Sequence, residues 1–351
     1  MRLLTVFCIL GSMNGRYSRQ ILFQPIGTSG QEKLSNSRVL LVGCGALGAA
    51  HAEMLARAGV GKLRIVDRDF VEYTNLQRQT LFSEPDAAER LPKAVAARNR
   101  ISQINSDVEV EAIVADVNHS NVENLIKDCD LVLDGTDNFQ IRYLINDACV
   151  KTKKTWIYGA AVSSYGATMT IFPFKTPCLR CIFEEMPSAG SAPTCDTAGV
   201  IMPIIASVSA IQAAEALKIL TGNHDKLHKS LIQIDVWQND WRKIKLSAPN
   251  ADCECCGKRN FEFLEADSIE FSAVLCGRNA VQISPPRPAQ IDLQNLGEKL
   301  KNLGETKLNE YLLRFNIDEY ELTIFRDGRA IIHGTDDVSA ARSIYAKYIG
   351  V

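Results

Sequence analysis

Residues 38–48 read RVLLVGCGALG and predict a strand, a tight turn and the start of a helix. The run 38–42 is apolar after Arg38, as in a strand buried on both faces, and an alanine-rich segment follows the turn. Gly43, Gly45 and Gly48 form a G-x-G-x-x-G pattern between the two elements. Glycines at this spacing let backbone N–H groups approach a phosphate at the positive end of a helix dipole. The stretch therefore predicts a nucleotide-binding βαβ unit.

An acidic residue follows where such a unit places one. Lys62–Asp67 reads KLRIVD, a second apolar strand, and Asp67 lies 24 residues after Gly43. A carboxylate at the end of this strand can accept hydrogen bonds from ribose hydroxyls. A nicotinamide or flavin oxidoreductase would carry the same turn and the same acid. These residues therefore predict a nucleotide site but leave the reaction open.

The alternation of strands and helices continues along the chain. Six further segments follow it: 93–104 (helix), 108–114 (strand), 121–127 (helix), 131–134 (strand), 139–150 (helix) and 155–159 (strand). This order implies right-handed βαβ units on a parallel sheet. Three later segments look antiparallel around a long apolar helix at 200–220: 167–172, 231–236 and 241–246. We predict an α/β fold with a Rossmann-like, doubly wound mixed sheet.

A composition shift near Asn250–Gly257 separates this region from a second unit. Tyr320–His333 reads as a strand, an Asp327-Gly328 turn and a strand, and a helix is expected at 338–348. We therefore predict three parts. They are a disordered extension at 1–15, with Met1 or Met13 as the start, a nucleotide-binding domain at 16–264, and a small α+β domain at 265–351.

Composition excludes some partners. The formal net charge of −2 gives no general attraction to nucleic acid or to an anionic membrane. The apolar run Leu3–Leu10 is too short to cross a bilayer. Eleven cysteines are too few for a disulfide scaffold at this length, which predicts a reducing, cytoplasmic location.

Polar residues beyond the second strand favour a triphosphate over a dinucleotide. The loop 69–79 contains Asn75, Gln77 and Arg78, and Lys93 opens the next predicted helix. Arg78 and Lys93 supply two cations where a triphosphate tail could extend, and a guanidinium suits phosphate oxygens.

A further acid follows the strand 131–134. Asp137 in LVLDGTDN would lie at the carboxyl edge of the parallel sheet, where ligands bind and where a carboxylate can hold Mg²⁺. The alternative is that Asp137 or Asn138 caps the helix that follows.

Two cysteine pairs have metal-ligand spacing. Cys178 and Cys181 form one C-x-x-C pair, and Cys253 and Cys256 form another, so four thiolates can close a tetrahedral Zn²⁺ site. Cys255 makes the second pair ambiguous, and unmetallated thiols are the alternative reading.

Cys195 stands apart from these pairs. It follows a loop rich in Pro, Ser and Gly and leads into a helix, where the pKa of a thiol is lowered. It could be a nucleophile or a packing residue.

Taken together, these motifs resemble the ThiF/MoeB family, relatives of the ubiquitin-activating enzymes. The resemblance covers about 16–257, and its pieces occur in family order: Arg16-Tyr17-Ser18-Arg19-Gln20, Gly30-Gln31-Glu32, RVLLVGCGALG, LRIVDRD, NLQRQ, LPK, DGTDN and Thr194-Cys195-Asp196-Thr197-Ala198-Gly199-Val200. Their joint occurrence is far more specific than the glycine-rich turn by itself.

The resemblance implies an adenylyltransferase that uses ATP and Mg²⁺ on the C-terminal Gly-Gly of a ubiquitin-like sulfur carrier. Asp67 would hold the ribose, Arg78 and Lys93 the phosphates, and Asp137 the Mg²⁺. Arg19 would reach the triphosphate of the partner subunit, which implies a homodimer. The predicted nucleotide-binding set is Gly43, Gly45, Gly48, Asp67, Asn75, Gln77, Arg78, Lys93 and Asp137, and the predicted catalytic set is Arg19, Arg78, Lys93, Asp137 and Cys195.

Several points stay open at this stage. The carrier could serve thiamine thiazole or molybdopterin synthesis, and in some family members the cysteine matching Cys195 forms an acyl persulfide with it. The C-terminal unit lacks a rhodanese cysteine loop, so a separate sulfur donor protein is expected. The alternatives are an NAD(P)-dependent oxidoreductase, an adenylating enzyme acting on tRNA or a peptide, and a non-catalytic, zinc-stapled module that binds a ubiquitin-like protein.

Overall fold

The computed structural model describes residues 15–187, 194–265, 272–275, 279–285 and 289–350. The chain divides after Glu265 into two compact units, each with its own sheet. The expected extension at 1–15, including Met1 and Met13, lies outside the described residues except for Gly15.

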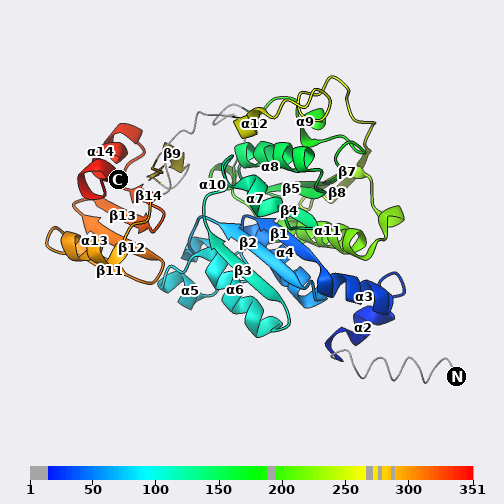
Figure 1. Ribbon diagram of the computed structural model, residues 1–351, viewed down its shortest axis with the longest axis horizontal. Coiled ribbons are helices and arrows are strands. Elements are labelled where there is room, and N and C mark those ends of the chain that lie inside the picture. Colours follow the sequence, from blue (N-terminus) through cyan, green and yellow to red (C-terminus); the bar gives the residue numbers. More distant parts are fainter. Residues whose placement is uncertain (1–14, 188–193, 266–271, 276–278, 286–288, 351) are drawn as a thin grey trace. The chain divides into compact units, whose positions relative to one another are not determined.

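The first unit is built on an eight-stranded mixed sheet with the order β3-β2-β1-β4-β5-β6-β7-β8 (Figure 1). The strands from β3 to β5 pair in parallel, and those from β5 to β8 pair antiparallel. Their bounds are β1 Arg38–Val42, β2 Lys62–Asp67, β3 Glu109–Val114, β4 Leu131–Asp134, β5 Trp156–Val162, β6 Tyr165–Ile171, β7 Ser230–Asp235 and β8 Asp240–Lys245. The predicted Rossmann-like mixed sheet is confirmed, and the strand order reverses between β1 and β4, where such sheets bind ligands.

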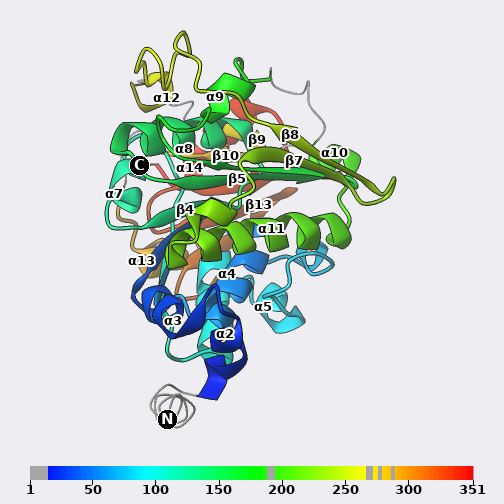
Figure 2. The ribbon, with the colours of Figure 1, turned by 90° about the vertical axis from the view of Figure 1, so that its right-hand side faces the viewer.

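Helices cover both faces of this sheet (Figures 1 and 2). One face packs against α4, α6, α3 and α11, and the other packs against α7 and α8. The helices are α2 Ser18–Leu22, α3 Gly27–Asn36, α4 Ala46–Ala58, α5 Glu84–Ala88, α6 Lys93–Ile104, α7 Val122–Ile126, α8 Phe139–Thr152, α9 Leu179–Ile182, α10 Cys195–Ala198, α11 Met202–Thr221 and α12 Glu262–Glu265, with 3-10 turns η1 Gly15–Tyr17, η2 Tyr73–Asn75 and η3 His224–Lys226.

The helix α4 ends at Ala58, and Gly59 is its C-cap. This glycine has φ +80°, which glycine adopts without steric cost. A Cβ there would lie 2.6 Å from Cζ of Tyr17, so the end of α4 packs directly on the N-terminal segment. Asn105 completes this corner by donating from Nδ2 to the Tyr17 hydroxyl and the Ala56 carbonyl, both at 2.7 Å.

The apolar helix α11 is long and apolar enough to cross a membrane by length and composition. It packs instead against α4, β5 and β6, and 56% of its apolar window is buried within the protein. Pro203 lies in the first turn of the helix, where backbone N–H groups have no partner within the helix and where proline, which lacks this group, is favoured. The helix accordingly begins at Met202 and not at 200.

The second unit is a six-stranded antiparallel sheet with the order β11-β12-β13-β14-β10-β9. Two helices, α13 Leu293–Leu300 and α14 Val338–Tyr348, pack on its apolar cluster. The strands are β9 Ser272–Leu275, β10 Ala280–Ile283, β11 Glu305–Leu308, β12 Leu312–Ile317, β13 Tyr320–Phe325 and β14 Ala330–His333. The predicted hairpin is present: β13 pairs with β14 across a turn in which Gly328 has φ +87°.

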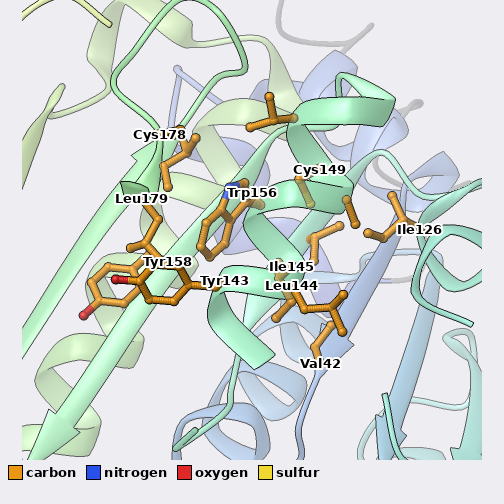
Figure 3. Close-up of a cluster of buried hydrophobic side chains, with 14 of the residues drawn as sticks. Val42, Ile126, Tyr143, Leu144, Ile145, Cys149, Trp156, Tyr158, Cys178 and Leu179 are labelled. Atoms are coloured by element: carbon orange, nitrogen blue, oxygen red, sulfur yellow. The ribbon is translucent and has the colours of Figure 1, made fainter. Parts of the chain in front are cut away.

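Trp156 lies at the centre of the core between the sheet and α8 (Figure 3). Its side chain is fully buried, whereas Trp241 on β8 is 59% exposed. We expect Trp156→Ala to lower the free energy of unfolding by about 3–5 kcal/mol because it removes a large buried side chain and leaves a cavity. Urea unfolding followed by circular dichroism measures the change, and Trp241→Ala is the control, expected within about 0.5 kcal/mol of the natural chain. A loss below about 1 kcal/mol for Trp156→Ala would contradict this packing.

Candidate active site and cysteine cluster

The glycine-rich turn brings the ends of β1 and β4 into backbone contact. Gly43 has φ +85°, and a Cβ there would lie 2.8 Å from the carbonyl oxygen of Gly135. A Cβ on Gly48 would lie 2.0 Å from the carbonyl oxygen of Gly43. No side chain fits at either position, so the first turn of α4 lies against the edge of the sheet. The N–H groups of this turn have no carbonyl of their own helix to bond, so they could hold an anion at the positive end of the helix dipole.

Asp67 joins this turn to the loop that follows β2. Its Oδ2 accepts from the Cys44 N–H at 2.6 Å, and its Oδ1 accepts from the Asp69 N–H at 2.7 Å. Burial raises the pKa of the Asp67 carboxyl, while the nearby Lys93 ammonium lowers it. Each oxygen keeps a second lone pair, so the carboxylate can fix the turn and still accept a ligand hydroxyl.

Lys93 is a buried cation beside this carboxylate. Its side chain is 5% exposed, and its Nζ lies 3.2 Å from Oδ2 of Asp69. The Lys93 N–H also donates to the Asp69 carbonyl at 2.9 Å, which anchors the first turn of α6 on the same loop. The ammonium is therefore held near the glycine-rich turn and is ready to pair with an anion.

The NLQRQ segment closes the site from the other side. Asn75 is buried and accepts from the Glu72 N–H at 3.0 Å, which shapes the turn η2. Arg78 donates to the Thr74 carbonyl at 2.9 Å, and the exposed Gln77 reaches the Val200 carbonyl at 3.5 Å. Asn75 therefore serves the loop itself, whereas Arg78 keeps further N–H donors for a ligand.

Gln79 is a site residue that the motif analysis did not single out. It is 4% exposed, its Nε2 lies 3.9 Å from the Cβ position of Gly45, and its Oε1 has no hydrogen-bond partner among the described residues. The only sequence feature that could have identified Gln79 was its position as the last residue of the NLQRQ motif. Which residue of that short turn faces the glycines depends on the fold of the loop.

At the end of β4, the two acids of DGTDN have different roles. Asp134 is fully buried, and its Oδ2 pairs with Nε of Arg142 at 3.1 Å. Its Oδ1 accepts from the backbone N–H of Thr136 at 2.9 Å and from its hydroxyl at 2.7 Å. Asp137 is exposed, and Asn138 caps α8 by accepting from the Ile141 N–H at 3.3 Å. The carboxylate of Asp137 is thus left at the surface, and the sequence did not reveal the buried pair.

Besides Arg142, the motif analysis missed Arg68, a cation that lies among acidic side chains at this edge of the sheet. The side chain of Arg68 is 28% exposed and lies 3.4 Å from Asp116. Burial lowers the pKa of its guanidinium, but Asp116, Asp69 and Asp137 together raise it above its ordinary value. The arginine follows Asp67 in LRIVDRD, so its position was visible in the sequence but its acidic neighbours were not.

Arg19 lies away from all of these residues. It is exposed on α2, and the adjacent Gln20 donates to the Ala58 carbonyl at 2.8 Å. Ala58 ends α4, whose other end carries the glycine-rich turn. The thirteen residues of α4 therefore separate Ala58 from the glycine-rich turn by roughly 20 Å. We call the carboxyl edge of the parallel sheet, with the glycine-rich turn, Asp67, Lys93 and Asp137, the nucleotide edge. Within one chain, the structure does not bring Arg19 to this edge.

The four cysteines of the two C-x-x-C pairs come together beside Asn146, in the middle of α8. Their sulfurs lie within 4.8 Å of one another, with distances of 3.6 Å for Cys178–Cys253, 3.4 Å for Cys181–Cys256 and 3.9 Å for Cys178–Cys181. Sulfurs bound tetrahedrally to zinc at about 2.3 Å lie about 3.8 Å apart. The cluster can therefore hold a metal such as zinc. Cys255 is not one of these four; its sulfur accepts from Nδ2 of Asn146 at 3.1 Å and also contacts Cys178.

Cys195 is the first residue of α10, next to the N-cap Thr194. Its sulfur is half-buried and lies 3.5 Å from the Ala161 carbonyl near the end of β5. Most of the Pro-, Ser- and Gly-rich loop before it, residues 188–193, lies outside the described residues. The helix is a single short turn, and Cys195 is not in the cysteine cluster.

Comparisons with known proteins agree with this geometry. A family model described as "ThiF family" matches residues 17–255. The chain is 46% identical over 340 residues to the sulfur carrier protein ThiS adenylyltransferase of Bacillus subtilis, covering 96% of this chain and 100% of the relative. It is 38% identical over 260 residues to the SAMP-activating enzyme E1 of Haloferax volcanii, covering 74% and 95%.

Solved structures show the same fold. A crystal structure of E. coli MccB with ATP superimposes with a TM-score of 0.60 at 25% identity, covering 70% of this chain and 75% of that one. The family predicted from the motifs is thereby confirmed. On the family match and the two relatives, the chain belongs to the ThiF family.

Proposed function

We propose that this enzyme adenylates the C-terminal carboxylate of a ubiquitin-like sulfur carrier protein, using ATP. The observation that carries the proposal is the carboxyl edge of the parallel sheet, where the N–H groups of the glycine-rich turn, Asp67 and Lys93 converge beside the surface carboxylate of Asp137. The similarity to a ThiS adenylyltransferase over 96% of the chain supports the same activity.

The residues of this edge have distinct tasks. The N–H groups before α4 bind phosphate oxygens, and Lys93 and Arg78 balance the charge that develops when the phosphate chain is broken. Asp67 would fix the ribose, and Asp137 would hold Mg²⁺, which would neutralise negative charge on the phosphates. A carrier carboxylate oxygen attacks the α-phosphorus, the bond to the β-phosphate oxygen breaks, and pyrophosphate leaves. The product is a mixed acyl–phosphate anhydride, the acyl adenylate.

We propose that the carrier ends in Gly-Gly, since a tail without side chains can extend to the α-phosphorus without steric obstruction. We propose the carrier of thiamine thiazole synthesis, since the similarity to the ThiS adenylyltransferase also covers the C-terminal unit. In a later step, a separate donor protein would supply a sulfane sulfur that makes Cys195 a persulfide. The outer sulfur of this persulfide would attack the carrier's acyl carbon, AMP would leave, and an acyl persulfide would form. We further propose that this occurs in the cytoplasm, where thiols stay reduced.

An oxidoreductase reading explains the glycine-rich turn but gives no role to Arg78, Lys93 and Asp137. A non-catalytic binding module would likewise have no use for a buried ammonium beside an anion site. The adenylation reading gives each of these groups a task.

The exposed carboxylate of Asp137 is the first test. We expect Asp137→Ala to lower ATP–pyrophosphate exchange by at least about 100-fold because metal-assisted charge stabilisation is lost. The exchange is measured with a carrier that ends in Gly-Gly, and a carrier without these two residues should give no signal. Asp128→Ala, which removes an exposed carboxylate beyond the opposite end of β4, is the matched control and should retain the natural rate. Undiminished exchange in Asp137→Ala would remove Asp137 from the mechanism.

The remote position of Arg19 leads us to propose a homodimer in which Arg19 completes the partner's site. Arg19→Ala and Asp137→Ala should each be inactive alone. After mixing and subunit exchange, activity should recover to about one quarter of the natural rate, because about half the dimers are mixed and each mixed dimer has one intact site. If Arg19 acts within its own chain, the mixture stays inactive.

Zinc is the metal that best fits the four thiols. We expect about one zinc per purified chain, and Cys178→Ser should abolish its retention because a structural site needs four ligands. Cys129→Ser is the control, since Cys129 is also a buried thiol but is not in the cluster. Elemental analysis after dialysis measures both. Zinc-free natural protein with full stability would contradict the proposed site.

A further inference from the structure

One buried amide connects the two halves of the cysteine cluster. Asn146 on α8 is fully buried, and both ends of its side chain are engaged. Its Oδ1 accepts from the Leu179 N–H at 2.9 Å, and its Nδ2 donates to the Cys255 sulfur at 3.1 Å. Leu179 follows the ligand Cys178, and both lie beside the core packed on α8 (Figure 3).

These two contacts reach the two C-x-x-C turns separately. Leu179 lies within the turn Cys178–Cys181, and Cys255 lies within the turn Cys253–Cys256, although the turns are 71 residues apart. A single side chain on a rigid helix therefore sets the spacing between the turns without relying on the metal. That spacing brings sulfurs of opposite turns to 3.6 and 3.4 Å.

The same amide also decides which thiols face the metal. The segment Cys253-Glu254-Cys255-Cys256 contains three thiols, but only two of them can complete a four-cysteine site with Cys178 and Cys181. The Cys255 sulfur accepts from Asn146 and also contacts Asp147 and Cys178, whereas the sulfurs of Cys253 and Cys256 are the two that lie within 4.8 Å of both Cys178 and Cys181. A donor held against the third sulfur thus resolves the ambiguity that the sequence leaves open.

The neighbouring residue reinforces this arrangement. Oδ2 of Asp147 accepts from the Phe263 N–H at 3.1 Å and ties down the segment after the second turn. Four residues before Asn146, Arg142 pairs with the buried Asp134 at the end of β4. The helix α8 therefore holds the cysteine cluster and the nucleotide edge on one rigid element.

We propose that Asn146 is a positioning residue for the metal: it holds the two turns in register and fixes the ligands as Cys178, Cys181, Cys253 and Cys256. This inference rests on the zinc site of the proposed function. Groups that orient metal ligands without touching the metal typically change metal affinity by about 10- to 100-fold when removed.

The test measures zinc affinity of the full-length chain by competition with a chelator of known affinity. Asn146→Leu keeps the size of the side chain but loses both hydrogen bonds, and we expect zinc to bind about 10- to 100-fold more weakly. Asn105→Leu is the control: Asn105 is also a buried, hydrogen-bonded asparagine, but it contacts α4, on the other face of the sheet from α8. Its replacement should lower stability while leaving zinc affinity unchanged.

The ligand assignment is tested without changing Asn146, so it holds even if Asn146→Leu fails to fold. Cobalt bound in place of zinc reports the number of thiolate ligands by its absorption spectrum. Cys255→Ala should keep the four-thiolate spectrum, and the adjacent Cys256→Ala should lose it. Zinc affinity within about threefold of the natural value in folded Asn146→Leu, or loss of the four-thiolate spectrum in Cys255→Ala, would overturn the inference. If the natural chain itself binds no zinc, the proposed metal site fails instead.

Discussion

The nucleotide edge depends on close backbone contact between the ends of β1 and β4. A Cβ on Gly135 would lie 2.6 Å from the carbonyl oxygen of Gly43, and one on Gly48 would lie even closer to it. Because no side chain separates these segments, the first turn of α4 and the loop after β4 share one small space. This contact places helix N–H groups beside the loop that carries Asp137, and the rest of the site is arranged around it.

Charges at this edge are held by burial and mutual pairing. Lys93 is held by Asp69, Arg68 by Asp116 and Arg142 by Asp134, so each cation has a fixed position before a ligand arrives. Preorganised charges stabilise a transition state without reorganising at the moment of reaction. The pair Asp134–Arg142 differs from the others because it is fully enclosed, so its role is to shape the loop that carries Asp137 and not to bind a ligand.

The helix α8 links three parts of the first unit. Besides Arg142 and Asn146, it carries Tyr143, whose hydroxyl donates to the carbonyls of Phe183 and Glu185 at 2.8 and 2.9 Å. These carbonyls precede the loop that leads to Cys195. The nucleotide edge, the start of that loop and the cysteine cluster are therefore all fixed to one helix, although their residues are far apart in sequence.

The sequence by itself determined the alternation of strands and helices from β1 to β5, the mixed sheet and the family, because apolar periodicity, glycine spacing and contiguous motifs are local properties. It also predicted the four-cysteine set. Only the tertiary structure decided that Asn138 caps α8 while Asp137 stays exposed, that Arg19 is remote from its own glycine-rich turn, and that Cys255 faces Asn146. Each of these depends on which distant segment meets a side chain, and packing between elements sets that pairing.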